Sequence, residues 1–158
     1  MKKILYLLIL QLAMVQSFAQ VAGKKRAIPP SYVTESIAQT VMATWKDSFS
    51  LGNQAKWSYD MGVILKGFEG IWRNTGDVKY YNYILRQMDF FVQDDGTIKT
   101  YRPDEYNIDH INNGKLVLLL YRITQKEKYL KAAKLLREQL RTHPRTKEGG
   151  FWHKAIYP

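Results

Sequence analysis

The chain has 158 residues, which suits one domain of ordinary size, and a composition of 46% hydrophobic and 24% charged residues that excludes a disordered protein. It contains no cysteine, which excludes disulfide bonds, thiol catalysis and lipid attachment through a cysteine. The formal net charge of +10 permits binding to nucleic acid or to an acidic polysaccharide, and it also describes an ordinary solvated basic surface. Because the sequence has no dense Lys/Arg run and no nucleic-acid-binding motif, we expect no nucleic-acid partner.

The first 19 residues have the three parts of a secretory signal peptide. Lys2 and Lys3 form a positive start, residues 4–15 are apolar apart from one glutamine, and residues 17–19 offer small side chains to a signal peptidase. We expect cleavage after residue 19, which leaves the protein in the periplasm or secreted and not attached to a membrane. The alternative is an uncleaved anchor, although the apolar run is shorter than the roughly 20 residues that span a bilayer.

Residues 20–30 are predicted to be a linker, since the Pro-Pro pair that closes them cannot continue a helix. The rest of the chain, residues 31–158, is predicted to be helical. Apolar residues recur with the period of an α-helix in five segments: 32–46, 59–73, 78–92, 109–123 and 126–141. Residues 97–101 alternate and are β-prone, which indicates a short hairpin or extended loop, and we expect a loop from residue 142 onward.

Two of these helix pairs repeat. Residues 71–80 match residues 120–129 in their Arg, Thr, Lys and Tyr positions at a constant offset, and the same offset places Asp60 on Asp109. A period near 50 residues is typical of repeat architectures, here an open solenoid or a closed α/α toroid. The inner helices are apolar on nearly every side, and the first contains three glycines that predict close approach by a neighbouring backbone. Both features favour the toroid.

In a toroid, the loops before the inner helices gather at one end of the barrel axis. The residues so gathered are aromatic, amide, acidic and basic: Trp57, Tyr59, Asp60, Tyr106, Asn107, Asp109 and His110. Such a cleft suits sugar chemistry, in which carboxyl groups donate and accept protons. By position alone, Asp109 and Asp60 are also typical helix N-caps, and His110 is typical of a packed or surface residue.

A third loop follows the last helix, where Gly149 and Gly150 predict a tight turn before an aromatic-His-Lys run. His153 and Lys154 could hold a carboxylate-bearing ligand through charge-assisted hydrogen bonds. The alternative is simply a basic segment of chain.

The segments Trp57-Ser58-Tyr59-Asp60-Met61-Gly62, Tyr106-Asn107-Ile108-Asp109 and Gly149-Gly150-Phe151-Trp152-His153-Lys154 resemble the unsaturated rhamnogalacturonyl hydrolases of glycoside hydrolase family 105. These enzymes are related to the unsaturated glucuronyl hydrolases of family 88. The resemblance covers the chain after the signal peptide, but only the N-terminal part of such an enzyme. It implies an all-α fold, an (α/α)6 toroid of helical hairpins, of which this chain supplies about the first half.

The resemblance also implies an activity. Such enzymes release a 4,5-unsaturated uronic acid from the non-reducing end of pectin-derived oligosaccharides by hydrating its vinyl ether, with no metal and no cofactor. Asp109 matches a supporting acid of the family, and Tyr59, His153 and Lys154 match positions lining the subsite for the unsaturated sugar. Trp57 is predicted to bind substrate from the cleft wall.

One element of the family pattern does not occur in this sequence. The principal acid of the family lies in a Trp-Leu-Asp-Gly motif shortly after the His-Lys pair, and these 158 residues contain no such motif. We therefore expect the chain to be truncated and to have little hydrolase activity alone. The alternative function is that of an exported, noncatalytic helical-repeat binding module.

Overall fold

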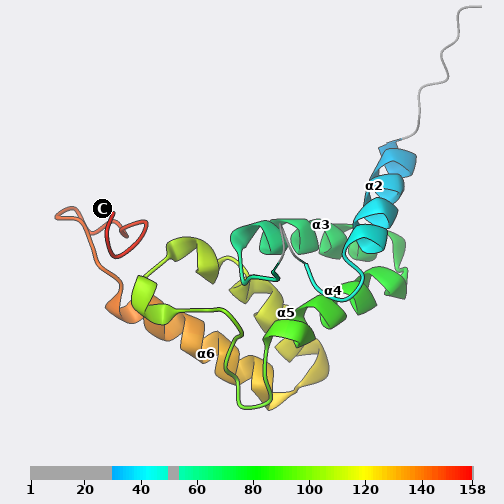
Figure 1. Ribbon diagram of the computed structural model, residues 1–158. Helices are drawn as coiled ribbons and strands as arrows, with labels where there is room; N and C mark the ends of the chain where they lie inside the picture. Colours follow the sequence, from blue (N-terminus) through cyan, green and yellow to red (C-terminus); the bar gives the residue numbers. More distant parts are fainter. Residues whose placement is uncertain (1–29, 50–53, 158) are drawn as a thin grey trace, which may run out of the picture. The chain divides into compact units, whose positions relative to one another are not determined.

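The computed structural model describes residues 30–49 and 54–157, so the predicted signal peptide and nearly all of the predicted linker lie outside the described residues. The described helices are α2 (Pro30–Thr44), α3 (Tyr59–Thr75), α4 (Val78–Phe91), α5 (Gly114–Thr124) and α6 (Glu127–Thr142), with one-turn 3-10 helices η1 (Pro103–Glu105) and η2 (Ile108–Ile111) before α5. Figure 1 shows α4 beside α3 and α6 beside α5, as two antiparallel hairpins. None of the helices in the described part of the chain is long and apolar enough to cross a membrane.

The predicted repeat is visible in the backbone. Each inner helix ends in a left-handed residue, Gly76 after α3 and Gln125 after α5, whose N–H donates to the carbonyl four residues earlier. The hydroxyl of Thr75 donates to the carbonyl of Ile71 at 2.8 Å, and that of Thr124 does the same one repeat later at 2.7 Å. The matching sequences therefore form matching turns.

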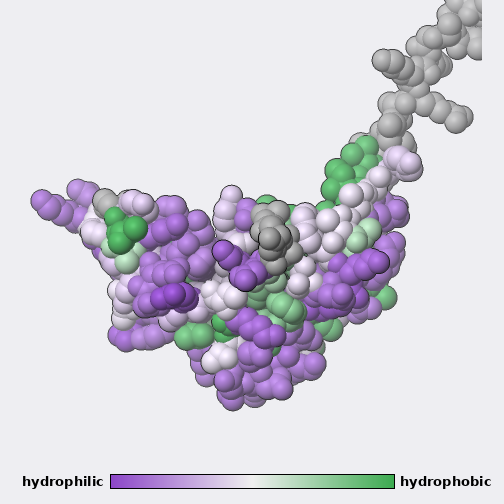
Figure 2. Space-filling model, in the orientation of Figure 1, coloured by the Kyte–Doolittle hydropathy of each residue, from purple (hydrophilic) through white to green (hydrophobic). Residues whose placement is uncertain are grey.

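The core is made by the apolar faces of these hairpins. Tyr80 and Tyr129, which correspond in the repeat, are both buried, and the ring of Phe68 packs edge-on against Tyr80. On the face of the molecule drawn in Figure 2, hydrophilic side chains cover most of the described surface, and apolar side chains are exposed in separate patches.

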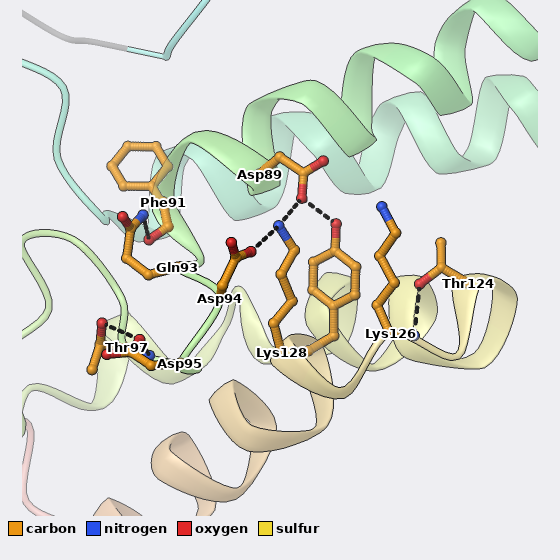
Figure 3. Close-up of polar contacts among 10 residues, drawn as sticks. Asp89, Phe91, Gln93, Asp94, Asp95, Thr97, Thr124, Lys126 and Lys128 are labelled. Carbon is orange, nitrogen blue, oxygen red and sulfur yellow. Dashed lines mark hydrogen bonds and ion pairs between the residues drawn. The ribbon is translucent and has the colours of Figure 1, made fainter.

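Polar contacts join the two repeats at the end of α4. Lys128, at the start of α6, lies between Asp89 and Asp94, with its ammonium 2.7 Å and 3.7 Å from their carboxylates (Figure 3). The hydroxyl of Tyr129 donates to the same Asp89 at 2.5 Å. The pKa of Tyr129 is raised, first by burial and then by this carboxylate. One half-buried aspartate thus receives two donors from the next hairpin.

A close approach exists at one of the three glycines of α3 and not at the other two, and the predicted partner, a neighbouring backbone, is wrong. A side chain at Gly62 would collide with Asn113 and Asn112, so a close approach exists there, made by side chains and not by backbone. At Gly67 and Gly70 nothing lies within 4 Å of where a Cβ would stand. These two glycines lie on the exposed side of α3, and no neighbouring element packs against them in the described structure.

Small β-bridges close the loops after the outer helices. Val92 pairs with Ile98 around a turn at residues 94–96, and Arg145 pairs with Phe151 around a turn in which Gly149 has a φ of 89°. The first bridge begins the hairpin predicted for residues 97–101. The second confirms the tight turn predicted from the glycine pair.

Candidate active site

Three loops meet beside the starts of the inner helices, as the repeat predicted. The backbone N–H of Trp57 donates to the hydroxyl of Thr100 at 2.8 Å, and its indole N–H donates to the carbonyl of His110 at 2.8 Å. The backbone N–H of Ile108 donates to the carbonyl of His153 at 3.0 Å. These bonds tie the loop before α3 to the loop before α5, and that loop to the C-terminal segment.

Asp109 does not cap the long helix that follows it. The cap of η2 is Asn107, whose side-chain oxygen accepts from the backbone N–H of Asp109 at 3.1 Å, and α5 begins only at Gly114. The cap interpretation of Asp109 is therefore wrong. Its carboxylate, with a side chain 40% exposed, is left for other contacts.

That carboxylate contacts a histidine from the third loop. Oδ2 of Asp109 lies 3.0 Å from Nε2 of His153, whose side chain is 51% exposed. An aspartate at this distance fixes the orientation of an imidazole. The structure thus brings together two predicted site residues that stand 44 positions apart in the sequence.

Tyr59 stands at the same rim, at the first position of α3, and is 49% exposed. The charge of the Asp60 carboxylate and a hydrogen bond to it raise the pKa of Tyr59, and the charge of Asp109 raises it further. Asp60 lies in the first turn of α3 but is not its cap, which is Ser58.

Lys154 is held next to His153 by a backbone turn. Its N–H donates to the carbonyl of Tyr157 at 3.3 Å, and the N–H of Tyr157 donates back at 3.0 Å. The N–H of Ala155 donates to the carbonyl of Glu105 at 3.0 Å, which fastens the turn to the loop before α5. The backbone of Lys154 is thus fixed beside the loop before α5, and its charge acts on His110.

Two residues expected in the cleft are packed beneath it. Trp57 is 1% exposed and its indole meets Phe91 edge-on, so the structure does not bring this predicted substrate-binding side chain to the surface. His110 is half-buried against Tyr101, and burial lowers its pKa, with the charge of Lys154 acting in the same direction. Both support the loop that carries Asp109.

A groove of about 950 Å³ opens beside this rim between α3, α5 and α6. Tyr59 and Asp109 stand on its wall, and Lys115, Lys134 and Arg137 bring positive charge to it. Its remaining lining is mainly apolar: Val63, Ile108, Ile111, Leu118, Leu130, Ala133, Leu136 and Leu140. The groove offers room for a ligand of several sugar rings or for a further packed element. Among the described residues, no cluster of three acidic or histidine side chains is placed to hold a metal ion.

Sequence reasoning missed a buried polar pair behind the site. Gln139 is 2% exposed and His143 is 4% exposed, and both belong to the segment that ends α6. The helical spacing of the sequence could have indicated that Gln139 is buried, because Gln139 falls on the same face of the helix as the buried Leu136 and Ala132.

Two successive helical hairpins, with polar loops gathered beside the starts of their inner helices, have the architecture of an α/α toroid, present here in part. Residues 33–158 match the family described as Glycosyl Hydrolase Family 88, and the chain belongs to this family. A solved structure titled "Structural Analysis of C. acetobutylicum ATCC 824 Glycoside Hydrolase From Family 105" is similar at 45% identity with a TM-score of 0.70. The match covers 79% of this chain and 33% of that one, so this chain spans about a third of its relative's length.

The resemblance drawn from the sequence is thereby confirmed, as is the all-α toroid of helical hairpins. The chain therefore belongs to a family of glycoside hydrolases and spans part of such a protein.

Proposed function

We propose that this chain supplies part of the site of a glycosidase that releases 4,5-unsaturated uronic acid from the non-reducing end of pectin-derived, rhamnogalacturonan oligosaccharides. The observation that carries the proposal is the Asp109–His153 contact of 3.0 Å at an exposed rim. An unsaturated uronate has a carboxylate and a vinyl ether, and the rim has groups suited to each.

In the proposed pose, Lys154 and His153 receive the uronate carboxylate through charge-assisted hydrogen bonds. Tyr59, which is exposed at this rim and lines the groove, bonds a sugar hydroxyl. Trp57 acts beneath the rim and not on the sugar, because it is 1% exposed. Asp109 is oriented by His153 and faces the ring as the supporting acid.

The proposed reaction is a hydration. A carboxylic acid adds a proton to C4 of the C4=C5 bond, which leaves positive charge shared by C5 and the ring oxygen. Water then adds at C5 and gives up a proton to the carboxylate, and the resulting hemiketal opens to release the sugar. The step needs a well-placed acid and base but no metal or cofactor.

The experiment is a paired measurement of turnover and binding with an unsaturated galacturonyl-rhamnose disaccharide. Turnover is followed by loss of the vinyl-ether absorbance, and binding by calorimetry. Because the family's Trp-Leu-Asp-Gly acid is not in this sequence, we expect binding with little turnover from the 158-residue chain alone. Absence of binding to the unsaturated disaccharide would contradict the proposal. A saturated galacturonate disaccharide serves as the comparison ligand. Strong turnover would contradict the dependence on a second acid.

A noncatalytic binding role is the second candidate. It is favoured by the cationic side chains along the groove, which suit an anionic sugar chain whether or not it is cleaved. Equal affinity for the saturated and unsaturated disaccharides would favour this role, since a binding module has no need of the double bond.

We further propose that the protein acts in the periplasm or outside the cell after removal of residues 1–19. N-terminal sequencing of the exported protein should begin at Gln20. Recovery of the uncleaved chain in the membrane fraction would overturn this.

A further inference from the structure

A buried polar connection lies behind the Asp109–His153 pair. Gln139 accepts from the hydroxyl of Tyr101 at 2.7 Å, and its amide nitrogen donates to the carbonyl of Asn107 at 3.1 Å. The same nitrogen lies 3.3 Å from Nδ1 of His143. All of its donor hydrogens and an acceptor site are therefore used, which fixes the amide in one orientation.

His143 continues the connection to the third loop. Its Nε2 lies 2.8 Å from the carbonyl oxygen of Trp152, and a carbonyl can only accept, so Nε2 carries the proton. Nδ1 is then the acceptor for Gln139. The imidazole is also held edge-on by Tyr106 at 5.5 Å and by Phe151 at 5.3 Å between ring centroids. Its position and its tautomer are thus both determined by neighbours.

The two ends of this connection adjoin the reactive pair. Asn107 caps the backbone N–H of Asp109, and the Trp152 carbonyl belongs to the peptide that enters His153. In front, the same loops are joined by the Ile108–His153 backbone bond and by the Asp109–His153 contact. The Gln139–His143 pair therefore closes a ring of hydrogen bonds in which the separation of the two loops is fixed from both sides.

We propose that Gln139 and His143 are positioning residues that hold Asp109 and His153 at hydrogen-bond distance for sugar binding. The part that concerns sugar binding rests on the function proposed above. The part that concerns loop separation does not, and it can be measured without any sugar.

The chain contains a matched control. Gln87 is a fully buried glutamine on the outer helix of the preceding repeat, and its amide donates to the carbonyl of Trp45 at 2.9 Å. Gln87→Met and Gln139→Met each remove a buried amide from an outer helix, but only Gln139 contacts the loops of the site. His143→Phe keeps the ring contacts and removes both hydrogen bonds, whereas His143→Gln can restore a donor and an acceptor.

The experiment measures amide hydrogen exchange at Ile108 in the full chain, together with the dissociation constant for the unsaturated galacturonyl-rhamnose disaccharide. We expect Gln139→Met and His143→Phe to speed exchange at Ile108 about tenfold beyond Gln87→Met and to weaken sugar binding about tenfold. His143→Gln should stay within about threefold of the wild type in both readouts.

The result that overturns the proposal is exchange at Ile108 no faster in Gln139→Met and His143→Phe than in Gln87→Met. If Gln139→Met or His143→Phe fails to fold, amide exchange at Ile108 is compared between His143→Gln and His143→Ala instead, and that comparison decides the question. If the wild type binds no sugar but the exchange pattern is found, the positioning role stands and the proposed function fails. The two failures are therefore distinguishable.

Discussion

Gly76 and Gln125 occupy the same place in successive repeats, and both adopt the left-handed conformation, with φ of 70° and 55°. Each ends an inner helix and lets the chain turn into an outer helix two residues later. A glycine meets this requirement without cost, whereas a glutamine does so at a steric cost. The turn geometry is therefore set by the repeat and not by one residue type.

Opposite effects are expected for two alanine substitutions, one at the residue that follows α3 and one inside it. Gly76→Ala should destabilise the protein by about 1 kcal/mol, because alanine resists a positive φ. Gly67→Ala should stabilise it by about 1 kcal/mol, because alanine is the better helix former and nothing lies within 4 Å of the new Cβ. Urea denaturation of both variants checks the pair, and two changes of the same sign would contradict the assigned conformations.

Asp109→Asn tests the site directly. Its partner His153 is half-exposed, so loss of the contact should cost less than about 1 kcal/mol of stability. Affinity for the unsaturated disaccharide should fall about ten- to hundredfold, as expected when a charge-assisted hydrogen bond is lost. Calorimetric titration measures the affinity. The control is Asp104→Asn, which removes an exposed carboxylate paired with Arg102, and affinity equally reduced in both variants would refute the assignment.

Stability should fall in alkaline solution. Burial raises the pKa of Tyr83 to about 12 and that of Tyr101 to about 12, from an ordinary value of 10.0. Between pH 10 and 12 the unfolded chain loses these protons while the folded chain keeps them. The free energy of unfolding should therefore decrease by about 1.4 kcal/mol per pH unit for each tyrosine in that window.

The alkaline slope can be assigned by substitution. Tyr83→Phe removes a hydroxyl that donates to the carbonyl of Trp45, and it should reduce the slope by the share of one tyrosine. Urea unfolding at a series of pH values from 8 to 11.5 gives the slopes. An unchanged slope in the variant would show that Tyr83 ionises normally in the folded state.

The apolar groove predicts self-association of the isolated chain. Leu118 is 49% exposed on the groove wall, and exposed apolar patches of this kind promote contact between molecules. Leu118→Lys should shift the chain toward monomer in light scattering coupled to gel filtration. Val78→Lys changes a similarly exposed residue that does not line the groove, and it should leave association unchanged. A wild-type chain that is monomeric with a cooperative thermal transition would contradict the prediction.

Local patterns predicted the helices well. The inner helix predicted for residues 59–73 is α3, and the outer helix predicted for residues 78–92 is α4, each displaced by no more than two residues. The helix predicted to begin near Asp109 instead starts as η2 and becomes α5 at Gly114. Asn113, which lies between η2 and α5, donates a hydrogen bond to the carbonyl of Ser58 in the loop before α3 at 2.9 Å. That partner is remote in sequence, so no local pattern could indicate it.

The sequence by itself determined the repeat, because hydrophobic period and turn residues act over a few positions and recur with the same offset. It also determined that acidic and aromatic residues precede the inner helices. Only the tertiary structure decided which of them reach the surface. Trp57 is buried with its indole bonded to the His110 carbonyl. Asn107 takes the capping position and leaves Asp109 free of it, and backbone bonds between distant loops bring His153 to Asp109. Burial and pairing depend on contacts across 40 or more positions, which no single stretch of sequence contains.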